Sequence, residues 1–125
     1  MDIQELSTRL SEDLRLIGLP VDDIEIRFSN KYVKTYYGLY YPKADKYDPF
    51  IMLYPYRIPN SNFTYKYEQI LDTAIHEMCH HIQWSDPNYV RIKGVVHDAE
   101  FWEMYNKYIN RAETAGILKG CEEND

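Results

Sequence analysis

The stretch A-I-H-E-M-C-H-H-I-Q-W, residues 74–84, holds three of the four histidines of the chain, and a glutamate directly follows the first of them. The fourth histidine, His97, comes 16 residues after His81. All the imidazole groups of a 125-residue chain therefore lie between positions 76 and 97. This clustering indicates a site whose chemistry needs several imidazoles together.

Apolar residues recur at helical spacing around these histidines, which predicts a long helix over residues 64–84 with Thr64 as its N-cap. On that helix, His76 and His80 lie one turn apart on the same side, where two ring nitrogens can reach one ion at about 2.0–2.1 Å. Glu77 lies about 100° further round the helix. It is too far round to be a third ligand, but well placed to hold a water on the metal. The H-E-x-x-H pattern thus predicts two ligands and a general base.

A third ligand is expected from another segment, because catalytic zinc keeps three protein ligands and one open position. His97 is the predicted third ligand, since a last helix beginning beside it would carry it back across the first. Glu100 and Asp98 are the alternatives, because carboxylates also bind zinc. Asp98 is expected instead to cap the last helix or to orient an imidazole by a hydrogen bond.

Other side chains near the motif have two interpretations each. His81 lies about 100° round the helix from His80, so we expect it to be exposed or hydrogen-bonded, with a substrate contact as the alternative. Cys79 is expected to be a reduced core thiol, because two cysteines cannot form a disulfide framework. Phe101 and Trp102 are expected to pack the last helix against the ligand helix, with a role in lining a pocket as the alternative.

The rest of the chain predicts an α+β fold in one domain, residues 1–125, with a frayed tail from about residue 118. Apolar residues at three- and four-residue steps predict a helix over residues 2–17, and a last helix over residues 98–115. Strands are predicted at residues 24–29, 32–41 and 50–54, in a mainly antiparallel sheet. A free edge of the third strand could pair with an extended peptide at the rim of a cleft.

Composition gives weaker indications. The hydrophobic content of 45% and charged content of 27% are ordinary for a soluble globular protein. No apolar run approaches the roughly 18 residues that span a membrane, and the N-terminus lacks the positive charge and apolar block of a secretory signal. We therefore expect a cytoplasmic protein with no membrane partner. The sequence does not indicate an oligomeric state.

The segment 27–67 is basic and rich in tyrosine, although the whole chain carries a net charge of −6. It holds seven basic and two acidic residues, a net charge of +5, and ten of the 13 tyrosines. One interpretation is a surface for a polyanion or a single nucleic-acid strand. The favoured interpretation is a tyrosine-rich antiparallel sheet with lysines on its solvated face.

Two stretches, I-L-D-T-A-I-H-E-M-C-H-H-I-Q-W (70–84) and G-V-V-H-D-A-E-F-W-E-M-Y-N-K-Y-I-N (94–110), resemble the SprT-like metallopeptidase domain. That family also includes the protease domain of Spartan, which acts on DNA–protein crosslinks. The resemblance covers roughly residues 65–112, with Asp98 where the family usually has glycine and Val96 where another glycine is usual. The chain looks like a small stand-alone version, without the zinc ribbon of many bacterial members.

The resemblance implies a minimal zincin-like fold with one catalytic Zn²⁺ held by His76, His80 and His97. Glu77 would be the catalytic acid/base that acts on a zinc-bound water, and the substrate would be an extended polypeptide. DNA dependence does not carry over. The alternatives are a zinc-stabilised module that binds protein or nucleic acid without proteolysis, and an amidase for a non-peptide substrate.

Overall fold

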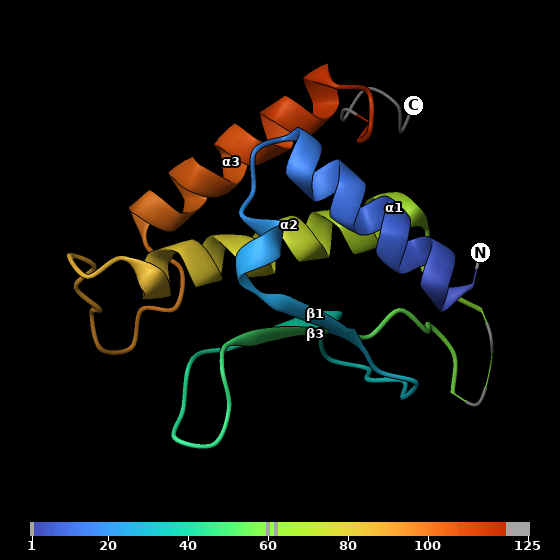
Figure 1. Cartoon of the computed structure of the whole chain (residues 1–125), viewed down its shortest axis with the longest axis horizontal. Helices are drawn as coiled ribbons and strands as arrows, with labels where there is room; N and C mark the ends of the chain where they lie inside the picture. Colours follow the sequence, from blue (N-terminus) through green and yellow to red (C-terminus); the bar gives the residue numbers. More distant parts are fainter. Residues whose placement is uncertain (1, 60, 62, 120–125) are drawn as a thin grey trace.

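The chain has an α+β fold, as the sequence predicts (Figure 1). The structure is a computed structural model, and it describes residues 2–59, 61 and 63–119. The predicted tail C-E-E-N-D, with Cys121, lies outside the described residues. The elements, in chain order, are α1 (Ile3–Leu16), the short 3-10 helix η1 (Val21–Asp23), β1 (Glu25–Phe28), β2 (Gly38–Tyr41), β3 (Phe50–Leu53), α2 (Tyr67–Ser85) and α3 (Ala99–Thr114).

The sheet is mixed, with strand order β1-β3-β2. β3 pairs in parallel with β1, with Glu25 opposite Phe50, and antiparallel with β2, with Gly38 opposite Leu53. The prediction of a mainly antiparallel sheet is therefore right for only one of the two pairings. The prediction of a free edge on the third strand is wrong, because β3 is central. Its apolar residues Phe50, Ile51 and Leu53 are buried, which explains why it takes the central position.

Two predicted boundaries differ from the structure. The strand expected over residues 32–41 is regular only from Gly38, so most of the basic, tyrosine-rich segment is loop and turn and not sheet. Helix α2 begins at Tyr67 after the N-cap Lys66, and Thr64 instead forms an isolated bridge with Tyr56. The neighbouring amide of Tyr65 donates to the Pro55 carbonyl, 2.8 Å away, which keeps this segment extended beside the end of β3.

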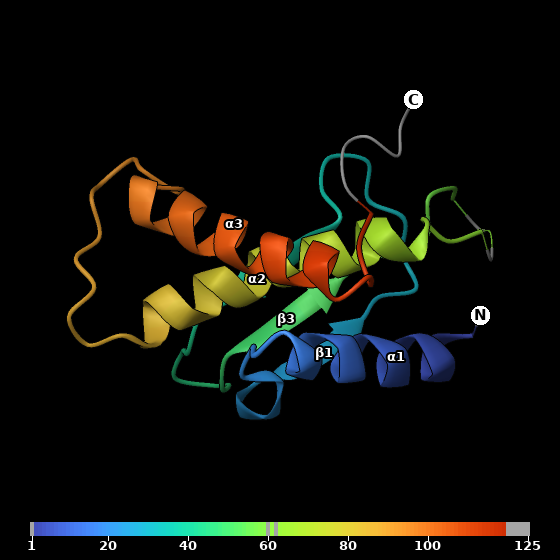
Figure 2. The same cartoon turned by 90° about the horizontal axis from the view of Figure 1, so that it is seen from above.

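All three helices lie on one side of the sheet, with α2 between the sheet and α3 (Figures 1 and 2). The core face of α2 holds Ile70, Leu71, Ala74, Ile75 and Met78, all buried. The predicted helix at the N-terminus is confirmed, with Leu6, Leu10 and Leu14 buried on one stripe. Burying each large apolar side chain stabilises a fold by roughly 1.5–3 kcal/mol. Because α2 buries several of them, it contributes much of the stability of the core.

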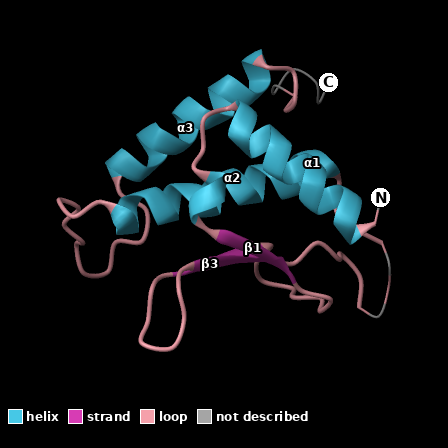
Figure 3. Ribbon diagram, viewed as in Figure 1, coloured by secondary structure: helices cyan, strands magenta, loops and turns pink. Residues whose placement is uncertain are grey.

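Strand β2 approaches α2 closely at Gly38. A Cβ atom there would lie 2.8 Å from Thr73 Cγ2 and 3.0 Å from Leu53 Cδ2, so only glycine fits without movement of its neighbours. The long connection between α2 and α3 has no helix or strand (Figure 3). None of the described helices has the length and apolar character needed to cross a membrane.

Candidate metal centre

His76 and His80 project from the same side of α2, as their spacing predicts, and both are half-buried. His97 comes from the end of the connection between the helices. Its neighbour Asp98 caps α3 by accepting a hydrogen bond from the Phe101 amide (2.8 Å). Asp98 also accepts from the Gln83 side-chain amide (3.0 Å), which ties the start of α3 to α2. The cap predicted for Asp98 is thus confirmed, and it holds His97 beside α2.

The three imidazoles, here called the three-histidine cluster, converge at their Nε2 atoms. His97 Nε2 lies 3.0 Å from His76 Nε2 and 3.1 Å from His80 Nε2. One neutral ring nitrogen carries either a proton or a lone pair, so a single hydrogen bond cannot satisfy both close contacts. A common cation can satisfy all three. Two nitrogens at zinc–nitrogen distance in a tetrahedral site lie about 3.3 Å apart, close to the spacing seen here.

The side chain of Phe101 packs against the whole cluster. Its ring centroid lies 4.9 Å from that of His76, 4.5 Å from that of His80 and 4.8 Å from that of His97, and it is fully buried. Burial in this apolar setting lowers the pKa of His76 and lowers that of His80 to about 4. At neutral pH both rings are therefore uncharged, which is the form that binds a metal.

Glu77 lies beside the cluster with only 7% of its surface exposed. Burial raises the pKa of its carboxyl group to about 7, although a hydrogen bond from the Tyr40 backbone amide opposes the rise. A carboxyl group with a pKa near neutrality can both take up and release a proton under ordinary conditions. Strand β2 thus contributes directly to the environment of the predicted base.

The cluster opens into a cleft with a volume of about 490 Å³, within the usual range for ligand sites. It lies between α2, the start of α3 and the edge strand β2. Its lining residues are Thr35, Tyr36, Tyr37, Gly38, Leu39, Asp72, Thr73, His76, Glu77, His80, Val96, His97, Trp102 and Tyr105. Trp102 is 44% exposed. The prediction that the side chain packs the last helix against α2 is therefore confirmed for Phe101. Trp102 instead lines the cleft, which was the alternative interpretation.

The remaining predictions near the motif have clear outcomes. Glu100 is exposed and does not join the cluster. His81 is buried, not exposed, and its Nδ1 lies 3.0 Å from the hydroxyl oxygen of Tyr40, a contact that links α2 to β2. His81 does not line the cleft. Cys79 is a free, fully buried thiol, as expected.

Several cleft residues were not found from the sequence. Asp72 and Tyr105 lie within the cleft, and the Tyr105 hydroxyl donates a hydrogen bond to Asp72. The position of Asp72, four residues before His76, was a usable signal, because it places both side chains on one helical face. No spacing marks Tyr36 or Tyr37, which reach the cleft from a loop.

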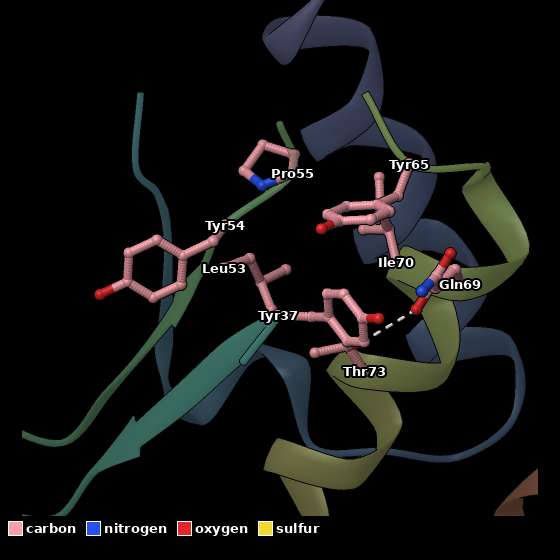
Figure 4. A pocket seen from close by; sticks show the side chains of 8 residues that line it. All are labelled: Tyr37, Leu53, Tyr54, Pro55, Tyr65, Gln69, Ile70 and Thr73. Carbon is pink, nitrogen blue, oxygen red and sulfur yellow. Dashed lines mark hydrogen bonds between the residues drawn. The ribbon is translucent and has the colours of Figure 1, made fainter. Parts of the chain in front are cut away.

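A neighbouring pocket is too small to compete as a ligand site. It has a volume of about 10 Å³, room for a single water, and is lined by the eight residues labelled in Figure 4. Tyr37 and Thr73 line both this pocket and the cleft. The Thr73 hydroxyl donates to the Gln69 carbonyl (2.9 Å), within its own helix. The small pocket is thus part of the packing that supports the wall of the cleft.

Within the described residues, the three histidines form the one group of three or more histidine, cysteine or acidic side chains whose ligand atoms lie close enough to hold an ion, all within 4.8 Å of one another. The chain can therefore hold a metal ion with three protein ligands and a side open to the cleft. Comparisons with protein-family models, with curated proteins and with solved structures found no match.

Proposed function

We propose that this chain is a zinc metallopeptidase of the SprT-like kind, which hydrolyses peptide bonds in extended polypeptides. The observation that carries the proposal is the convergence of three imidazoles beside a buried carboxyl group at the base of an open cleft. The resemblance of residues 70–84 and 94–110 to the SprT-like domain supports the same reaction.

The donor set fits zinc. Imidazole nitrogen is a preferred zinc ligand, and three protein ligands with one open position are typical of catalytic sites. A structural site normally has four protein ligands. Among the residues the structure describes, no fourth ligating side chain joins the cluster, and Cys79 is buried elsewhere in the core. This argues against a zinc site that only stabilises a binding module.

Zinc held there would supply Lewis-acid chemistry, acidifying a coordinated water and polarising a carbonyl group. Glu77 takes the proton from the water as its oxygen attacks the peptide carbonyl carbon, then gives a proton to the departing amine as the C–N bond breaks. In the metal-free chain, burial raises the pKa of Glu77 to about 7. A cation bound beside it would lower this pKa, so the carboxylate is then ready to accept the proton. The backbone of Tyr40 on β2 lies beside the carboxyl group of Glu77 and favours its charged form.

The shape of the cleft suits an extended chain. Strand β2 pairs with β3 along one edge and lies at the end of the sheet, and its residues Gly38 and Leu39 line the cleft. An edge strand can add an extended peptide through backbone hydrogen bonds, and these hold any sequence. We expected a peptide to pair with a free edge of the third strand, but in the structure the second strand, β2, offers such an edge beside the cleft.

The experiment is cleavage of an unfolded polypeptide by the zinc-loaded chain and by Glu77→Gln. We expect the wild type to cleave and the variant to lose activity by at least about a hundredfold while it keeps one zinc per chain, since proton transfer contributes roughly 10²–10⁴-fold. Glu103→Gln, the same change at an exposed position on α3 outside the cleft, should keep full activity. Equal cleavage by Glu77→Gln and the wild type would exclude Glu77 as the base.

A further inference from the structure

One carboxylate in the cleft has no part in the proposed reaction. Asp72 lies on α2 four residues before His76, so its backbone is displaced by roughly 6 Å along the helix axis from that of His76. It is half-buried, and its one hydrogen bond among the described residues comes from the Tyr105 hydroxyl. A carboxylate offers about four acceptor positions. Asp72 therefore has acceptor capacity left on the side that faces the cleft.

The charge of the cleft lining is one-sided. Asp72 and Glu77 are its acidic residues, and none of the lysines or arginines of the described chain is among the residues that line it. Asp72 also takes part in none of the ion pairs found in that part of the chain. Apart from a zinc ion on the three-histidine cluster, no cation of the described chain lies in this cleft, so the half-buried carboxylate can still attract a cation from a bound ligand. In a polypeptide substrate, the cationic groups that could bind here are lysine and arginine side chains.

Aromatic rings line the same cleft as this carboxylate. Tyr36, Tyr37 and Trp102 line the cleft and are 38%, 44% and 44% exposed, so their rings are accessible. The rings are also held in place by edge-to-face contacts. The centroid distances are 5.3 Å from Tyr36 to Tyr54, 4.7 Å from Tyr37 to Tyr65 and 5.6 Å from Trp102 to Tyr105.

Aromatic faces beside a carboxylate form a site for ammonium and guanidinium groups, because the ring faces attract cations and bury the aliphatic stem. We propose that the cleft selects a lysine or arginine side chain next to the bond to be cleaved, and that Asp72 determines this specificity. The inference rests on the proposed peptidase function for its substrate, while the cation site itself is independent of catalysis.

A structural role for Asp72 makes different predictions. If Asp72 only orients Tyr105 or supports His76, its loss would lower zinc content or slow the cleavage of all peptides equally. If it binds a substrate cation, its loss would act only on peptides that carry the cation. Asp72→Asn separates the two, because the amide oxygen still accepts from Tyr105 while the charge is removed.

The first test uses short unstructured peptides that differ at one central position, occupied by lysine, by norleucine or by glutamate. Norleucine has nearly the same aliphatic stem as lysine without the charge. We expect kcat/KM to be roughly tenfold to a hundredfold higher for the lysine peptide than for the norleucine peptide, as for a hydrogen bond to a charged group. Asp72→Asn should bring the kcat/KM values of the two peptides to within about threefold of each other, by slowing cleavage of the lysine peptide more than that of the norleucine peptide. Asp72→Glu should keep part of the preference.

The second test measures binding of the same peptides to zinc-loaded Glu77→Gln by calorimetry. A lysine preference in binding that Asp72→Asn removes would support the cation site even if no peptide were cleaved, and the peptidase proposal alone would then fail. Cleavage without a lysine preference, or an equal loss for all three peptides in Asp72→Asn, would overturn the inference and leave the peptidase proposal standing. Glu103→Gln is the control for loss of an acidic group outside the cleft.

Discussion

Gly38 on β2 lies so close to Thr73 on α2 that a Cβ atom at position 38 would stand 2.8 Å from Thr73 Cγ2. This contact sets the distance between the edge strand and the helix that bears the motif. The same strand carries Tyr40, whose hydroxyl oxygen lies 3.0 Å from His81 Nδ1 on α2 and whose backbone lies beside Glu77. The glycine thus acts on the candidate site through the position of a strand.

Gly38→Ala should destabilise the fold by about 1–3 kcal/mol, because an extra methyl group in a tight contact forces its neighbours apart. Urea unfolding measures the change. Thr73→Ser removes the Cγ2 atom and keeps a hydroxyl, so in the Gly38→Ala background it should recover part of the loss. If Gly38→Ala were as stable as the wild type, or if Thr73→Ser changed the stability equally in both backgrounds, the contact between positions 38 and 73 would not be tight.

Alanine in place of His76, His80 or His97 should weaken zinc binding by more than the roughly 10–100-fold lost when an outer partner of a ligand is removed. Competition with a chromophoric chelator measures the affinity. His81→Gln is the matched control, since His81 lies in the same stretch but bonds to Tyr40, and it should bind zinc within about tenfold of the wild type. A loss confined to His76 and His80 would remove His97 from the site.

Glu77→Gln should change how the stability of the metal-free chain depends on pH. The folded-state pKa of Glu77 is raised to about 7 by burial, so its favourable contribution is full below the unfolded pKa and is lost as pH rises through 7. The variant should therefore gain stability over the wild type between about pH 4.5 and 8, by roughly 2–3 kcal/mol. The histidine contributions, which have the opposite sign, largely cancel in this difference.

Chemical denaturation of both proteins at several pH values, with a chelator present, gives this difference directly. Glu103→Gln should show no such dependence, because that carboxyl group is exposed. A difference between wild type and Glu77→Gln that stays constant from pH 4.5 to 8 would mean that Glu77 ionises as freely in the folded chain as in the unfolded one.

Cys79 should resist alkylation in the folded chain. The thiol is fully buried, and burial raises its pKa to about 12, so roughly one molecule in ten thousand carries the reactive thiolate at pH 8. Mass spectrometry of a Cys121→Ser variant after iodoacetamide treatment follows this thiol alone. Labelling as fast in buffer as in concentrated urea would contradict its place in the core.

The helices and the histidine positions were predictable because the signals for them are local. The apolar spacing of α2 and the H-E-x-x-H pattern lie within one segment, and a helix fixes the relative direction of side chains four residues apart. Asp98 could be predicted as a cap because it directly precedes the apolar spacing of α3. The nearness of His97 to the other two imidazoles followed from these two helices together.

The sheet and the cleft walls were less predictable because they depend on contacts between distant segments. The central position of β3 and the short length of β2 are set by pairing partners that local sequence does not name. Thr64 looks like a cap, but the bridge to Tyr56 keeps it extended. Tyr36 and Tyr37 reach the cleft from irregular backbone, where no period indicates which side chains face inward.

In the proposed site, three imidazoles from two segments hold one ion that keeps an open position. X-ray absorption spectroscopy of the zinc-loaded chain tests this arrangement most directly, because it counts the atoms bound to the metal and identifies imidazole. We expect three imidazole nitrogens at about 2.0–2.1 Å from the zinc and one further light atom from solvent. Four ligands from the protein, or fewer than three imidazoles at a stoichiometric zinc, would contradict it.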